Sequence, residues 1–114
     1  MKNNQMMSIF FDSARGGDCV AVKVDNDLME PDGLTPGTVA IIKYQPEIME
    51  GKMMLFDIAQ YMETSEGLYI ARAKDKGGMW MVTFSKPGAR SLLIPKDQLH
   101  TIGRVMAYQK EIKD

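Results

Sequence analysis

The chain has few side chains that could act together as a nucleophile and its base. Several serines lie in or beside turns with no basic residue fixed next to them: Ser13, Ser65, Ser85 and Ser91. The single histidine, His100, has no serine or cysteine neighbour. One histidine and one cysteine, Cys19, exclude an internal disulfide framework and are too few for a structural zinc site. We therefore expect no metal and no cofactor.

The composition predicts one folded domain. The chain has 114 residues, of which 45% are hydrophobic and 25% charged, as in ordinary globular proteins. Lys and Arg number 14 against 15 Asp and Glu, so no excess positive charge favours direct binding to nucleic acid. No apolar run approaches the roughly 20 residues that cross a bilayer, and residues 1–5 do not begin a signal peptide. We expect a cytoplasmic protein that does not contact a membrane.

Short β-branched or apolar runs separated by turn residues predict a mostly-β domain of about seven or eight strands. The runs are 19–24, 38–44, 52–58, 68–73, 79–84, 91–94 and 101–108. We expect residues 61–62 and 68–73 to form a hairpin around 63–67, and we note a glycine, Gly103, inside the last run. Residues 1–17 are predicted to be an N-terminal arm and loop, and 18–114 a single domain.

The span from 22 to 43 carries the most informative pattern. Residues 26–31 read Asn-Asp-Leu-Met-Glu-Pro between two predicted strands, and 36–38 read Pro-Gly-Thr. Three further segments follow downstream: 50–55, 68–73 and 101–106. In the order and spacing of all these segments, the chain resembles the LexA-like family of self-cleaving repressors and mutagenesis proteins. The peptidase domain of that family is signal-peptidase-like, and its hallmark sequence is Gly-Asp-Ser-Met-x-Pro. The resemblance covers about residues 18–110 and implies a partly barrel-like arrangement of antiparallel sheets.

In that family a serine attacks a backbone carbonyl and a buried neutral lysine removes the serine proton. The resemblance places Leu28 at the serine position, because Met29 and Pro31 match their neighbours in the hallmark. It places Ala71 at the lysine position, because Arg72 matches the following arginine. Neither side chain can do the chemistry, so the resemblance implies a degenerate, non-catalytic member.

The same alignment makes structural predictions. Leu28 should lie on a turn that faces Ala71 on a neighbouring strand. The residues expected around the vestigial cleft are Asp27, Met29, Pro31 and Arg72. Residues 14–17, Ala-Arg-Gly-Gly, stand where the family carries its scissile linker, but a flexible glycine loop is the preferred interpretation of them.

Two other interpretations stay open at this point. The chain could be an active self-cleaving serine peptidase with unrecognised catalytic residues. It could also be a small β-barrel adaptor unrelated to the family, in which Leu28 and Ala71 are ordinary core residues and Arg72 a solvated strand charge.

Without catalysis, the expected function is association with other proteins. The apolar last strand presents an edge or face that a second copy of the chain would cover, with Ile102, Val105 and Met106 at a homodimer contact. The vacated cleft could instead hold a partner peptide. Family analogy suggests a bacterial stress-response, prophage or transcription-regulation context, with an intact LexA-like repressor as one possible partner.

Overall fold

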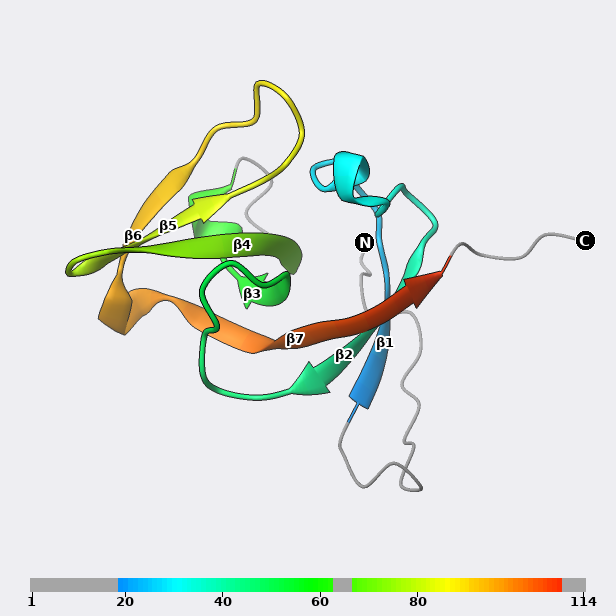
Figure 1. Ribbon diagram of the computed structural model, residues 1–114, viewed down its shortest axis with the longest axis horizontal. Helices are drawn as coiled ribbons and strands as arrows, with labels where there is room; N and C mark the ends of the chain where they lie inside the picture. Colours follow the sequence, from blue (N-terminus) through cyan, green and yellow to red (C-terminus); the bar gives the residue numbers. More distant parts are fainter. Residues whose placement is uncertain (1–18, 63–66, 110–114) are drawn as a thin grey trace, which may run out of the picture.

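The computed structural model describes residues 19–62 and 67–109, which form seven strands and three short 3-10 helices (Figure 1). The predicted arm at 1–17 and the loop at 63–66 lie outside these residues. The elements are β1 (Cys19–Lys23), η2 (Glu30–Asp32), β2 (Val39–Tyr44), β3 (Met54–Asp57), η3 (Ala59–Tyr61), β4 (Tyr69–Lys76), β5 (Met79–Thr83), β6 (Leu92–Pro95), η4 (Lys96–Gln98) and β7 (His100–Gln109).

All described strands belong to one antiparallel sheet with the order β1-β2-β7-β3-β4-β5-β6. The prediction of a mostly-β domain is confirmed. The sheet is not closed into a barrel, because β1 and β6 are its two ends and do not pair with each other. Figure 1 shows β4, β5 and β6 at one end of the molecule and β1 and β2 at the other, with β7 running between them.

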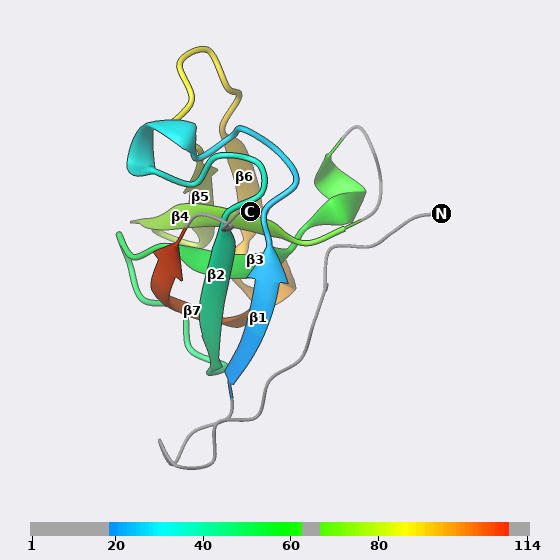
Figure 2. The same ribbon diagram turned by 90° about the vertical axis from the view of Figure 1, so that its right-hand side faces the viewer.

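The last strand lies inside the sheet. β7 pairs with β2 through residues 103–109 and with β3 through residues 100–104, and Figure 2 shows β2 between β1 and β7. Of the expected uncovered edge or face, the edge is therefore wrong, because both edges of β7 are paired. Its face is partly open, since Met106 and Tyr108 are exposed, and cover of that face by a second copy stays a prediction.

The predicted hairpin across residues 63–67 is also wrong. Tyr61 ends the 3-10 helix η3 instead of a strand, and the first part of β4 pairs with β3 in the register Met54↔Ala71. From Arg72 onward β4 pairs with β5, with Arg72 opposite Thr83. β4 thus links the two halves of the sheet.

Two apolar clusters stabilise these halves. The first is built mainly from β1, β2 and the turn after β1, and includes Val20, Met29 and Ile42. The second is built mainly from β3 to β6, and includes Phe56 and Ala71. None of the helices in the described part of the chain is long and apolar enough to span a membrane.

Candidate functional site

The turn that follows β1 is held by its own backbone and one side chain. The Leu28 amide donates to Oδ1 of Asn26 at 3.0 Å, which is the geometry of an Asx turn. The chain then enters η2, with Pro31 in its first turn, and leaves it through Gly33 at φ 96°. A left-handed residue of this kind favours glycine. Leu28 therefore lies at a fixed place, just before the 3-10 helix.

The structure brings Leu28 and Ala71 to the same apolar cluster. Leu28 is partly buried and packs against the cluster to which the fully buried Ala71 belongs. The Lys86 amide donates to the Leu28 carbonyl oxygen at 2.9 Å, so the loop after β5 also fixes this residue. The two positions that the sequence singled out thus belong to one apolar environment.

The four residues expected around the cleft have different surroundings in the structure. Met29 is buried in the first cluster, and Pro31 is exposed on η2. Asp27 pairs with Lys86 at 2.8 Å, a hydrogen bond that lowers the pKa of the Asp27 carboxyl. Arg72 points to a different carboxylate, Asp32.

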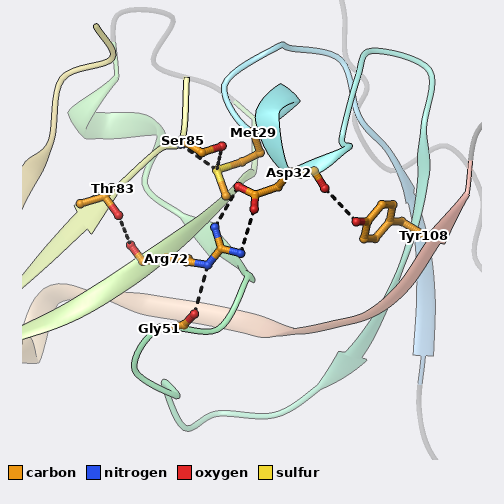
Figure 3. Close-up of polar contacts among 7 residues, drawn as sticks. All are labelled: Met29, Asp32, Gly51, Arg72, Thr83, Ser85 and Tyr108. Atoms are coloured by element: carbon orange, nitrogen blue, oxygen red, sulfur yellow. Dashed lines mark hydrogen bonds and ion pairs between the residues drawn. The ribbon is translucent and has the colours of Figure 1, made fainter. Parts of the chain in front are cut away.

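Arg72 is the centre of the polar contacts that hold η2 against β4 (Figure 3). Its Nη1 and Nη2 donate to the two carboxylate oxygens of Asp32 at 2.9 and 3.1 Å, and its Nε donates to the Gly51 carbonyl oxygen at 3.1 Å. The hydrogen bonds from Arg72 hold the pKa of Asp32 below its ordinary value, against a smaller opposing effect of burial. The bidentate geometry makes this a positioning contact between η2 and β4.

Ser85, in the loop after β5, lies beside this pair. Its amide and its Oγ contact the Met29 sulfur at 3.4 and 3.8 Å. A further hydrogen bond from the Ser85 side chain also lowers the pKa of Asp32. Figure 3 shows Ser85 and Met29 above the Asp32–Arg72 pair.

Tyr108, near the end of β7, holds the same turn from the other side. Its hydroxyl donates to the Asp32 carbonyl oxygen at 2.8 Å. The ring lies against Gly33, where an added Cβ would come within 3.1 Å of a ring carbon. Tyr108 was not singled out from the sequence, because it is 76 residues away from Asp32.

Replacing Tyr108 with Phe is expected to lower the free energy of unfolding by about 0.5 to 1 kcal/mol, since one hydrogen bond is lost while the ring stays. Urea denaturation measures the change. Tyr44→Phe is the matched control, because Tyr44 is about as exposed (40% against 42%) and no hydrogen bond of its hydroxyl is described. Equal effects of the two substitutions would contradict the role assigned to Tyr108.

The three residues predicted at a dimer contact line two separate hollows. Ile102 lines one with Tyr44, while Val105 and Met106 line the other. Ile102 and Val105 are partly buried against the protein's own first cluster, whereas Met106 is 48% exposed. Met106 is thus the most accessible of the three.

A narrow slot separates residues 22–26 from Leu68 and Ile70. Its volume is about 20 Å³, which is room for roughly one water molecule. No group of three or more His, Cys, Asp or Glu side chains that could hold a metal ion is present among residues 19–62 and 67–109.

The chain matches no protein-family model, and no curated protein is significantly similar to it in sequence.

Proposed function

We propose that the protein is a non-catalytic LexA-like peptidase-fold domain that acts by association with another protein. One observation carries the proposal: Leu28 and Ala71, at the positions where the family has serine and lysine, share one apolar cluster. The surrounding features fit the same alignment, since a strand leads into a fixed turn and β4 carries the second position.

The two replacements are physically compatible with each other. A lysine left buried without its serine would be forced to lose its charge or would cost several kcal/mol in desolvation. Alanine at the fully buried position 71 and leucine at position 28 add apolar contacts instead. Loss of both groups together therefore leaves a stable site.

The alternative of an active peptidase with substitute residues has one candidate nucleophile near the turn, Ser85. Its neighbours are a thioether and the Asp32 carboxylate. That carboxylate is engaged by Arg72, and its lowered pKa makes it a weak base for a serine hydroxyl. The geometry therefore favours association over catalysis.

Association through the surface is favoured over a peptide held at positions 28 and 71, because Ala71 is fully buried and Leu28 packs against the same cluster. By family analogy the association belongs to bacterial stress-response, prophage or transcription regulation, with an intact LexA-like repressor as a candidate partner. A homodimer through Ile102, Val105 and Met106 is the second proposed mode of association. Measuring the oligomeric state of the protein in solution tests it.

Prolonged incubation at pH 10 is expected to leave the full chain uncut, because Ala71 has no proton to lose where a family lysine would become a better base. Intact mass spectrometry is the measurement. The double variant Leu28→Ser/Ala71→Lys is the positive arm: it should gain a cut in the loop 14–17, and neither single variant should.

Two results would contradict the proposal. A specific cut in the wild-type loop 14–17 would make the protein an active peptidase. A double variant that is folded by circular dichroism and stays uncut would mean that positions 28 and 71 are not the former dyad.

A further inference from the structure

A shallow hollow lies on the surface between the segment before β3 and the middle of β7. Its volume is about 400 Å³, and its lining residues are Gly51, Lys52, Met53, Arg72, Arg104, Val105 and Met106. The backbone closes its floor, since the Val105 amide donates to the Met53 carbonyl oxygen at 3.0 Å. The hollow is therefore formed by residues of β4 and β7 on one side and by the connection before β3 on the other, and this hydrogen bond ties that connection to β7.

The three cationic side chains of the hollow differ in whether a carboxylate neutralises their charge. Arg72 is already paired with both oxygens of Asp32. Lys52 is exposed, and neither Lys52 nor Arg104 forms an ion pair with a carboxylate in the described part of the chain. The nearby Glu50 carboxylate accepts a hydrogen bond from the Asp75 amide instead. The hollow thus carries positive charge that no described carboxylate neutralises.

The Arg104 guanidinium is held in place by weak acceptors. Nη1 contacts the Met49 sulfur at 3.2 Å, and Nη2 contacts the Met106 sulfur at 3.5 Å. A thioether is a weak, uncharged acceptor, so a carboxylate would be a stronger partner for the same donors. The guanidinium is positioned but its hydrogen-bonding capacity is only weakly used.

The exposed apolar side chain of the hollow is Met106, which is 48% exposed. Met53 and Val105 also line the hollow, but they are half-buried and pack against the protein's own first cluster. Methionine side chains adapt to the shape of what they contact. An occupant that matches both features has apolar side chains next to a carboxylate.

We propose that this hollow binds an acidic and apolar segment of a partner protein, whose carboxylate pairs with Arg104 and Lys52 while an apolar side chain next to it contacts Met106. The inference names the partner chemistry for the proposed function and rests on it. Binding here also reaches the polar contacts of η2, because Arg72 lines the hollow and holds Asp32.

Other occupants fit the charge less well. A symmetric second copy would bring Arg104 and Lys52 toward their own counterparts, and like charges in a desolvated contact are destabilising. A nucleic acid needs a row of cations along its backbone, whereas this hollow offers two uncompensated ones in a chain of net charge -1.

The test is a titration of the ¹⁵N-labelled full chain with the peptide acetyl-Leu-Glu-Leu-Asp-Leu-Glu-amide, followed by amide chemical shifts. Shifts should concentrate at residues 51–53 and 104–106, with a dissociation constant below about 1 mM. Arg104→Gln is expected to weaken binding roughly tenfold, as loss of a charged hydrogen bond does, and Lys52→Gln by a smaller factor. Arg90→Gln, exposed between β5 and β6 and not among the lining residues, is the charge-matched control and should change nothing.

Each remaining outcome overturns the proposal. These are no binding at millimolar peptide, shifts centred elsewhere, and equal binding of the peptide with Gln and Asn in place of Glu and Asp. Sedimentation that shows a dimer, which Met106→Asp converts to monomer, would also overturn it. Peptide mass is read in the same samples. A cut peptide would contradict the non-catalytic function but not the binding site in the hollow. An intact peptide that does not bind would contradict the binding site but not the non-catalytic function.

Discussion

Replacing Gly103 with alanine is expected to destabilise the protein by about 3 kcal/mol or more, the upper range for forcing extra atoms into a closely packed place. Gly103 is buried in β7, opposite Tyr44 of β2 and Leu55 of β3. A Cβ there would overlap the Lys43 carbonyl oxygen and lie 2.7 Å from its carbonyl carbon. Backbone that is paired in a ladder cannot move aside without losing hydrogen bonds.

The penalty at Gly103 is steric and does not come from its backbone dihedrals, because its φ is outside the left-handed region. Gly78→Ala is therefore a suitable control: Gly78 also lacks a positive φ, and nothing lies within 4 Å of its added Cβ. Its effect should stay within about 0.5 kcal/mol. Guanidinium denaturation of both variants measures the difference. A Gly103→Ala variant as stable as Gly78→Ala would mean that β7 does not cross Lys43 this closely.

Several strands of the sheet could be predicted from the sequence, but the position of β7, which contains Gly103, could not. The runs at 19–24, 38–44 and 79–84 were recognisable as strands because alternation and flanking turn residues are local signals. The pairing of β7 between β2 and β3 was not predictable, because it joins segments about 45 to 70 residues apart. The last strand was therefore expected to present an uncovered edge or face, and the edge is wrong because β2 and β3 pair with both of its edges.

The candidate site likewise has residues that could be predicted from the sequence and residues that could not. Leu28 and Ala71 could be singled out because motif spacing is written in the sequence, and the structure brings them to one cluster. Asp32 was not singled out from the sequence, and Arg72 could equally have been a solvated charge. Their pairing spans 40 residues, and no local pattern marks which of several carboxylates an arginine will meet.

Removing Arg72 should have the second-largest effect on stability. Arg72→Met keeps the length and apolar part of the side chain but removes two hydrogen bonds to Asp32 and one to Gly51. We expect a loss of about 2 kcal/mol, less than for a fully buried pair, since the two side chains are 33% and 26% exposed and solvent screens them. A double-mutant cycle with Asp32→Asn should give a coupling energy of about 1 kcal/mol.

The same pair makes stability depend on pH. Hydrogen bonds from Arg72 lower the pKa of Asp32 in the folded protein, below the ordinary value of 3.8. The unfolded chain then binds the proton more readily, so the contribution is complete at pH values well above 3.8 and is lost as pH falls through the lower, folded pKa. Arg72→Met should therefore differ most from the wild type at pH 7 and approach it in acid. Asp27 and Asp75, whose pKa values are also lowered by their lysine partners, titrate alike in both proteins and cancel from the difference.

Urea midpoints of the wild type and of Arg72→Met, measured from pH 7 to pH 2.5, test this pH dependence. A constant difference in stability between the two proteins across that range would show that the Asp32 carboxylate does not contribute through Arg72.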